Sequence, residues 1–266
     1  MLSDITIGQF IPGNSILHRL DPRSKILGAI LFMILLFIVK NFWAYGILAL
    51  LALILIVISG VPVKYVLKGL RPIITILAFT MVLHFFLTPG KVIWEFWVFK
   101  LTMEGLVRGF FMSTRLILLV TVTSMLTLTT SPIALTDGIE LLLKPMQKIG
   151  VPAHELAMMM SIALRFIPTL LEETERIMKA QQARGADFET GSLVKRAKSL
   201  VPLLVPLFVG AFRRADELAV AMEARCYRGG VGRTRMKKLE WQIVDTIAVS
   251  LVVALMGLSI FERIFL

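Results

Sequence analysis

Few residues in this chain have the types and spacing that metal or nucleophile chemistry needs. His154-Glu155 begins like the zinc motif H-E-x-x-H, but Met158 stands where the second histidine belongs, so the motif lacks a ligand. Cys226 is the single cysteine, which excludes an internal disulfide and any cysteine-based zinc or iron–sulfur site within this chain. The sequence also contains no G-x-x-x-x-G-K-[ST] phosphate loop and no G-x-S-x-G elbow. We therefore expect no catalytic residue, no metal site and no cofactor in this chain.

Two arginines stand in a repeated pattern. Ala183-Arg184-Gly185 and Ala224-Arg225-Cys226 each follow a charged stretch, and glycine-containing sequence follows each. Glycine at or beyond a helix end is a stop signal. The helix dipole explains one arginine at a helix C-terminus, but two matching ends favour a second interpretation. In it, both arginines are exposed and dock into acidic grooves of a partner, where the planar guanidinium holds carboxylates bidentately.

The helices that must position these arginines lie in a polar insert, residues 131–240, with 17 Lys plus Arg and 12 Asp plus Glu. Ser131-Pro132 favours the start of a first helix, and Gly150 ends it. A second helix is predicted from Ala153 to about Arg184, bent at Pro168. A third has Leu200–Phe212 as its apolar half. Because the second and third helices are apolar first and charged last, we expect them to lie along the membrane surface.

The composition of the whole chain is that of a polytopic membrane protein. Of its 266 residues, 57% are hydrophobic and 18% are charged, and the mean hydropathy is +0.81. A span needs about 20 apolar residues, and five runs approach that length: Ile26–Val39, Phe42–Ser59, Ile73–Thr88, Met112–Thr130 and Ile243–Ile260. The predicted fold is all-α, with four spans in residues 1–130, a cytoplasmic module of two to three long amphipathic helices in 131–240, and a last span in 241–266.

The charges predict the orientation. The net charge of +11 sits between the apolar runs and in the polar insert, so we expect no nucleic-acid partner. Lys and Arg near span ends are more frequent on the cytoplasmic side. With the N-terminus inside, that side has Arg19, Arg23, Lys25, Lys64, Lys68, Arg71, Arg228, Arg233, Arg235, Lys237 and Lys238, and the other has Lys40, Lys91, Lys100 and Arg263. The N-terminus and residues 131–240 are therefore predicted to be cytoplasmic, the C-terminus to be outside, and Trp94 and Trp97 to lie in an outer interfacial segment.

Several motifs in order resemble those of one family. They are His18–Lys25 (HRLDPRSK), Leu164–Pro168 (LRFIP), Arg213–Glu217 (RRADE) and Glu223–Gly229 (EARCYRG), together with the two Ala-Arg patterns. Across nearly its whole length the chain resembles the transmembrane T component of energy-coupling factor transporters, the ABC-type importers of vitamins and metal ions.

The resemblance implies a function without catalysis by this chain. The polar insert would be a coupling module at the cell membrane. Its motifs around Arg184 and Arg225, with Ala183, Gly185, Ala224 and Cys226, would insert into grooves of two cytoplasmic ATPases that bind ATP and Mg²⁺. Cys226 departs from the glycine that is common there. A separate small substrate-binding membrane subunit would rest on the apolar halves, for which the candidate residues are Met158, Met159, Met160, Leu203, Leu204, Leu207 and Phe208.

Three alternatives stay open from the residues alone. A conventional ABC importer permease would have one docking motif and a polar path among its spans. An intramembrane enzyme would need paired acids or a nucleophile with a base inside a span, and the apolar runs contain His84 and Asp245 but no such pair. A membrane-surface anchor for anionic lipid would need only basic helices beside a bilayer.

Overall fold

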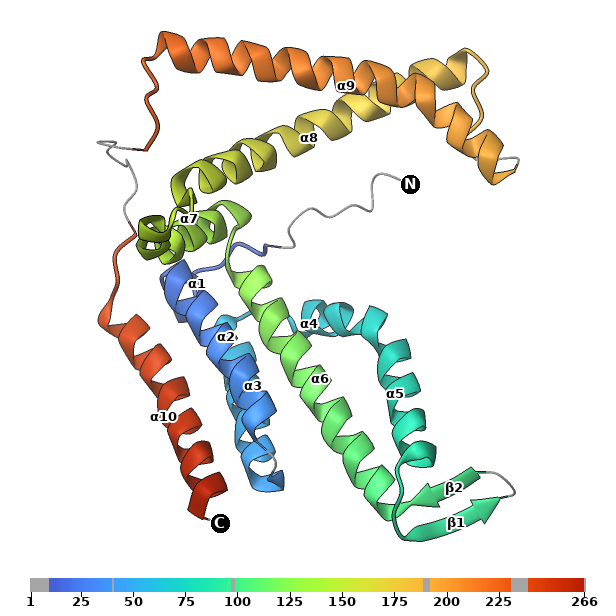
Figure 1. The fold of residues 1–266 in the computed structure, drawn as a ribbon, viewed down its shortest axis with the longest axis vertical. Coiled ribbons are helices and arrows are strands. Elements are labelled where there is room, and N and C mark those ends of the chain that lie inside the picture. The colour runs from blue at the N-terminus through green and yellow to red at the C-terminus, as the bar shows by residue number, and fades with distance from the viewer. Residues whose placement is uncertain (1–9, 40, 97–98, 189–191, 231–238, 266) are drawn as a thin grey trace. The chain divides into compact units, whose positions relative to one another are not determined.

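The apolar runs form long helices, as the computed structural model shows for all residues except 1–9, 40, 97–98, 189–191, 231–238 and 266 (Figure 1). The chain has two compact units. One is Ile139–Lys237, and the other joins Gly8–Gly138 to Lys238–Leu266. We call the first the coupling unit and the second the membrane unit.

The membrane unit is helical apart from one hairpin. Its elements are α1 (Ile16–Arg19), α2 (Pro22–Ile38), α3 (Phe42–Ser59), α4 (Val63–Leu70), the 3₁₀ turn η2 (Arg71–Ile73), α5 (Ile74–Leu87), β1 (Val92–Phe96), β2 (Phe99–Thr102), α6 (Met103–Thr129) and α10 (Ile243–Phe265). Helix α7 (Pro132–Leu143) begins in this unit and ends in the other.

In the part of the chain that the structure describes, five helical segments are long and apolar enough to cross a membrane, which confirms the predicted all-α polytopic class. They are Phe42–Ser59, Val63–Leu87, Met103–Thr129, Ala153–Ala183 and Ile243–Glu262. Four of them cover the second to fifth predicted runs, except for Thr88 and Thr130, the last residues of the third and fourth runs. The first predicted run lies in α2, which has 17 residues, near the lower limit of about 17 for a span. The segment Ala153–Ala183 has the lowest hydropathy of the five, 1.2 over its most apolar 18 residues, because even its apolar first half contains His154, Glu155 and Arg165.

A short antiparallel hairpin, β1 and β2, separates α5 from α6. We did not predict these strands, although Trp94 falls in β1; Trp97 lies outside the described residues. The sequence V-I-W-E-F is rich in the β-branched and aromatic residues that favour strands. At the end of the hairpin, the Thr102 hydroxyl donates to the Thr88 carbonyl at 2.8 Å and accepts from the Gly105 N–H at 3.1 Å. Thr102 therefore caps the start of α6.

The core of the membrane unit forms where α2, α3, α6 and α10 meet. Phe32, Leu35 and Leu36 of α2 are fully buried and pack with Leu48 of α3 and Val122 of α6, among others. Between helices in a membrane such side chains stabilise the bundle through close van der Waals packing, so this cluster fixes the arrangement of the four helices.

A buried polar network joins the starts of α2 and α10. The carboxylate of Asp245, with no exposed surface, accepts from the Asp21 N–H at 2.8 Å, from the Ser24 hydroxyl at 2.5 Å and from the Gln242 N–H at 2.8 Å. The Asp21 carboxylate in turn caps α2 and pairs with Arg23 at 2.9 Å. The H-R-L-D-P-R-S-K motif therefore has a structural role, which is to hold the ends of these helices together.

Lys25 extends the same network to the end of α6. Its ammonium donates to the Thr129 carbonyl at 3.1 Å and to the Thr130 hydroxyl at 3.0 Å. The buried carboxylates of Asp245 and Asp21 also attract this ammonium. This lysine thus ties three helix ends at one side of the unit.

The coupling unit has two long helices, α8 (Ala153–Ala183) and α9 (Leu193–Ala224), after the 3₁₀ turn η3 (Lys144–Ile149). The predicted start at Ser131-Pro132 is confirmed, since the Ser131 hydroxyl accepts from the Ala134 N–H at 3.3 Å. The predicted first helix was expected to continue to Gly150, but the α-helix ends at Leu143 and the 3₁₀ turn η3 follows it. Gly150, with φ of 93°, ends this turn. The predicted second helix, Ala153 to about Arg184, agrees with α8 to within one residue.

Candidate functional site

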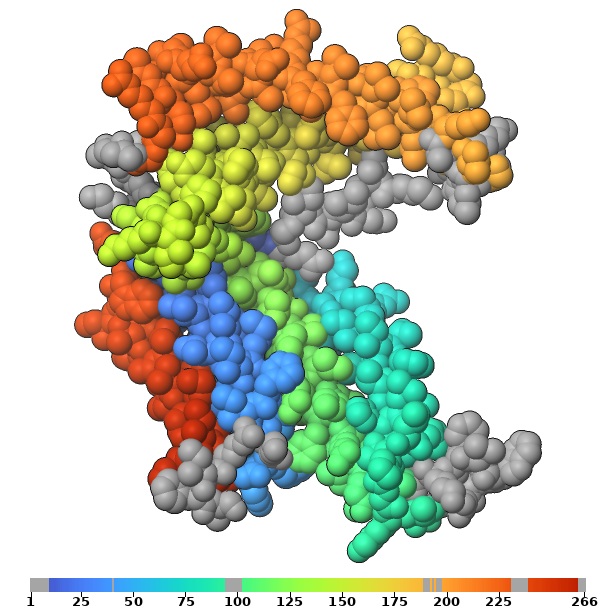
Figure 2. Space-filling model, in the orientation of Figure 1, coloured from blue at the N-terminus to red at the C-terminus, as the bar shows by residue number. Residues whose placement is uncertain are grey.

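Helices α8 and α9 form an antiparallel hairpin (Figures 1 and 2). Arg214 of α9 pairs with Glu173 of α8 at 2.5 Å, and the Gln181 side chain donates to the Pro202 carbonyl at 3.4 Å. Gly210 allows the close approach, because a Cβ there would lie 2.9 Å from a Glu173 oxygen. The later part of α8 is therefore packed against the middle of α9, from Pro202 to Arg214.

The end of α8 has a complete Schellman cap. The Arg184 N–H donates to the Gln181 carbonyl at 3.1 Å, the Gly185 N–H to the Gln182 carbonyl at 2.9 Å, and the Ala186 N–H to the Gln181 carbonyl at 2.9 Å. Gly185 has the left-handed φ of 86° that this cap requires. The cap stops the helix at Arg184, whose side chain is exposed.

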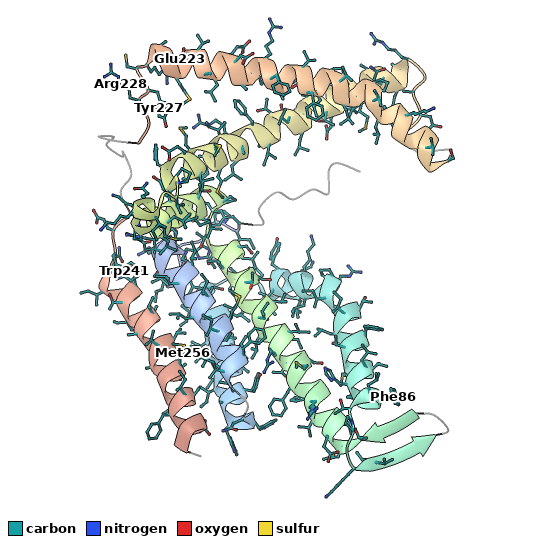
Figure 3. The ribbon with its side chains drawn as sticks, viewed as in Figure 1. Phe86, Glu223, Tyr227, Arg228, Trp241 and Met256 are labelled. Carbon is teal, nitrogen blue, oxygen red and sulfur yellow. The ribbon has the colours of Figure 1, made fainter. Side chains whose placement is uncertain are left out.

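The end of α9 repeats the same cap, bond for bond. The Arg225 N–H donates to the Met222 carbonyl at 3.1 Å, the Cys226 N–H to the Glu223 carbonyl at 2.8 Å, and the Tyr227 N–H to the Met222 carbonyl at 3.0 Å. Arg225 is exposed, and Figure 3 shows Glu223, Tyr227 and Arg228 around this end. The two predicted motifs are thus two copies of one local structure.

Cys226 occupies the left-handed position of the α9 cap. Its φ is 55°, the only positive φ of a non-glycine among the described residues. A side chain in this conformation costs about 1–2 kcal/mol. Glycine avoids that cost at the matching position in α8, so the cap of α9 is the more strained of the two.

The C-terminal ends of α8 and α9, at Arg184 and Arg225, are called the arginine ends. They lie far apart because the hairpin is antiparallel. Met158, near the start of α8, and Arg225 line one hollow. Counting from Met158 to Arg184 at ~1.5 Å per residue, the two arginine ends are about 40 Å apart. This separation exceeds the diameter of a small domain, roughly 30 Å, so each end can contact a different folded partner.

The α9 end differs from the α8 end in its surroundings. The hollow there has a volume of about 640 Å³, and its lining includes Met158, Arg165, Met222 and Arg228 beside Arg225. It lies where the start of α8 and the end of α9 diverge. The structure therefore brings together Arg225 and Met158, which we had assigned to contacts with different partners.

The predicted apolar contact residues differ in exposure. Met159 and Met160 are 55% and 42% exposed, and Leu204 and Phe208 are 41% and 59% exposed. Met158 and Leu207 are half-buried. The prediction that Leu203 contacts a partner is wrong. Leu203 is only 5% exposed, so its side chain is not available to a partner.

His154 has a structural role. Its Nδ1 lies 3.0 Å from the Glu140 carboxylate, and its ring lies against Gly230, where a Cβ would approach within 2.6 Å. Among the described residues there is no group of three His, Cys, Asp or Glu side chains that could hold a metal ion.

Sequence reasoning missed the hydrogen bonds of Asp245 to the start of α2 and the position of Arg165 in the lining of the hollow beside Arg225. Asp245 was noted only as an acid inside an apolar run, and no local pattern points to its partner Asp21. Arg165 could have been singled out, since it lies in the L-R-F-I-P motif and is exposed within an otherwise apolar half-helix.

Comparisons with known proteins agree on one family. The family model for the cobalt transport protein CbiQ matches residues 13–237. Energy-coupling factor transporter transmembrane proteins are similar over nearly the whole chain: one from Thermosediminibacter oceani is 60% identical over 93% of both chains, and one from Clostridium kluyveri is 56% identical over 100% of this chain and 99% of its own. The one from Bacillus subtilis is 50% identical over 99% of this chain and 100% of its own.

The chain belongs to the family of energy-coupling factor transporter transmembrane proteins, EcfT. It is a multi-pass membrane component of a transporter, as the resemblance implied. The EcfT relatives cover the membrane unit and both arginine ends, because the matches extend over at least 93% of this chain.

Proposed function

We propose that this chain couples two cytoplasmic ABC-type ATPases to a separate, small membrane protein that binds the transported substrate. The ATPases bind ATP and Mg²⁺, and this chain catalyses no step. The complex lies in the cell membrane, with the N-terminus and residues 131–240 of this chain in the cytoplasm and the C-terminus outside. The substrates are vitamins or other micronutrients, a class that fits the description of the matching family model.

The repeated cap carries this proposal. Two helices of similar length end in the same hydrogen-bond pattern, and each presents an exposed arginine. One such end has an explanation in the helix dipole. Two exposed arginines at opposite ends of one hairpin are suited to contact two similar partners at once. A guanidinium held by a rigid cap is well placed to bind carboxylates bidentately.

Motion passes through the hairpin in this proposal. When ATP draws the ATPases together, the two arginine ends follow, and the angle between α8 and α9 changes. The exposed apolar residues Met159, Met160, Leu204 and Phe208 contact the substrate-binding protein and move it. Methionine suits such a contact because its flexible side chain adapts to different surfaces.

Co-purification tests the docking step. The full complex is isolated through a tag on this chain, from wild type, Arg184→Glu, Arg225→Glu and the double variant. We expect ATPase recovery to fall in each single variant and to be lost in the double variant, because a carboxylate would face an acidic groove. Arg213→Glu is the control, since Arg213 is 82% exposed on α9, away from both ends. Unchanged recovery in the double variant contradicts the proposal.

A further inference from the structure

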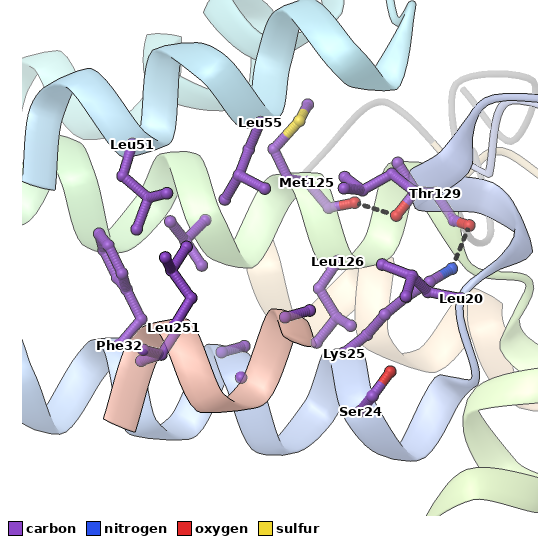
Figure 4. A pocket seen from close by; sticks show the side chains of 16 residues that line it. Leu20, Ser24, Lys25, Phe32, Leu51, Leu55, Met125, Leu126, Thr129 and Leu251 are labelled. Carbon is purple, nitrogen blue, oxygen red and sulfur yellow. Dashed lines mark hydrogen bonds between the residues drawn. The ribbon is translucent and has the colours of Figure 1, made fainter. Parts of the chain in front are cut away.

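The membrane unit has an apolar hollow between four helices. Its volume is about 140 Å³, and its walls come from α2, α3, α6 and α10 together with the end of α1. Figure 4 shows Phe32, Leu51, Met125 and Leu251 around it. An apolar cavity of similar size, about 150 Å³, holds a benzene molecule. The hollow therefore has room for several carbon atoms of a ligand.

A second hollow continues along the same pair of helices. Leu51 and Leu55 of α3 line the first hollow together with Ala248 and Leu251 of α10. The second is lined by residues of the same two helices, Ala44, Ile47 and Leu48 of α3 and Leu255, Leu258, Ser259, Phe261 and Glu262 of α10. The two helices run antiparallel, so the hollows follow one another along a single seam. From residue 248 to residue 261 the seam is about 20 Å long at ~1.5 Å per residue. That length is enough to cover the ~15 Å thickness of one bilayer leaflet's hydrocarbon, half of ~30 Å.

One end of the seam is cationic. Lys25 lines the first hollow with Ser24 and Thr129, and in Figure 4 its ammonium points to the Thr129 carbonyl. Its direct hydrogen-bond partners in the described residues are neutral oxygens of Thr129, Thr130 and His18. The carboxylates of Asp245 and Asp21 attract it from nearby, and both are already held by hydrogen bonds within the network at the helix ends. Arg19, at the end of α1 and beside the lining residue Leu20, is exposed. These cations lie on the side where positive charge predicts the cytoplasmic leaflet.

We propose that the seam between α3 and α10 binds one acyl chain of an anionic phospholipid, with the phosphate at the end formed by Lys25 and Arg19. A protein helix, about 10 Å across, is too wide for the first hollow, whereas a methylene chain fits. Leu251 is 48% exposed, so the wall is open to its surroundings, which are acyl chains around a membrane-spanning helix. Two cations complement a phosphate, and anionic lipids are attracted to such residues.

Photolabelling of the full chain in its native complex tests this proposal. The complex is placed in nanodiscs of phosphatidylcholine that contain a small fraction of phosphatidylglycerol with a diazirine on one acyl chain. Labelled peptides are then mapped. We expect label on lining residues of α3 and α10, about fivefold more than with a phosphatidylcholine probe of the same chain. Lys25→Gln should abolish this preference, and Lys64→Gln, an exposed lysine on α4, should keep it.

A second set of variants in the photolabelling experiment fills the hollow. Gly28 lines it, and a Cβ there meets no atom within 4 Å, so Gly28→Leu should remove most of the label. Gly46→Leu is the control, because Gly46 is equally open but lines neither hollow. If Gly28→Leu does not assemble, Ala248→Phe fills the hollow from α10.

Three results would each overturn the proposal. They are label that persists after the hollow is filled, equal label from the two lipid probes, and label that appears in the free chain but disappears in the complex. The last would show that a partner protein covers the seam. All three outcomes are independent of the arginine ends, so docking of the ATPases can stand while this proposal fails.

Discussion

The two units differ in how much they bury. In the membrane unit, α2, α3, α6 and α10 share a continuous cluster of buried side chains, and a buried polar network joins three helix ends. In the described part of the coupling unit, the buried side chains are Ala153, Ala157 and Leu203. The hairpin of α8 and α9 is therefore held by much less apolar burial than the helices of the membrane unit.

This difference suits a protein that transmits motion. Regions with few buried apolar contacts open and rearrange at low cost in free energy, whereas a packed core does not. The membrane unit can serve as a fixed frame, and the hairpin can change its angle when its ends are pulled. The proposed function requires this exposure of α8 and α9, since it needs both arginine ends and the apolar contact residues to stay accessible.

Removal of the Asp245 carboxylate should have the largest effect on stability. Asp245→Ala removes the acceptor of the buried Asp21 N–H and of the half-buried Gln242 N–H, and one of the two acceptors within reach of the buried Ser24 hydroxyl. We expect the free energy of unfolding of the membrane unit to fall by about 3 kcal/mol, measured by denaturant unfolding in detergent. Asp216→Ala, at an exposed site on α9, should change it by less than about 0.5 kcal/mol. Equal stability of the two variants would contradict the proposal that the membrane unit depends on buried contacts and the hairpin of α8 and α9 does not.

The ion pair between α8 and α9 should have a smaller and local effect. Arg214→Ala removes the partner of Glu173, a pair whose side chains are 30% and 26% exposed. We expect about 1 kcal/mol of lost stability, seen as roughly fivefold faster hydrogen exchange of amides in α8 and α9, with no change in α2 or α6. The adjacent Arg213→Ala, which breaks only an exposed pair with Glu217, should leave exchange unchanged. Faster exchange throughout the chain would show that the hairpin is not independent.

Exchanging the residues of the two caps should have the smallest effect. Cys226→Gly relieves the left-handed strain and should stabilise the α9 cap by about 1 kcal/mol, and Gly185→Cys should destabilise the α8 cap by about the same amount. Exchange of the Tyr227 and Ala186 amides, which close the caps, reports both changes. Effects of the same sign would mean that the two caps are not equivalent.

Elements with strong local signals could be predicted from the sequence. The bounds Phe42–Ser59 agree with α3, since Asn41 and Gly60 flank an unbroken apolar run. The ends of α8 follow from Pro152 and Gly185, and the matching caps follow from the repeated Ala-Arg pattern.

Features that depend on contacts distant in sequence could not be predicted. Asp245 meets Asp21 across 224 positions, and no local pattern encodes that pairing. Leu203 belongs to an apolar stretch whose members look alike in sequence, and only the packing of α9 on α8 decides which of them is buried. Arg225 and Met158 share a hollow because the two helices diverge, which is a property of the hairpin and not of either helix.

Site-specific photo-crosslinking tests most directly whether each arginine end holds one ATPase. A photoreactive amino acid replaces Ala183 or Ala224, exposed residues at matching positions of the two caps; Ala215, exposed on α9, is the control position. In the native complex we predict that Ala183 and Ala224 each crosslink to one ATPase subunit, and that Ala215 crosslinks to neither. Crosslinks to an ATPase from only one end, or from neither, would contradict the account of two equivalent docking ends.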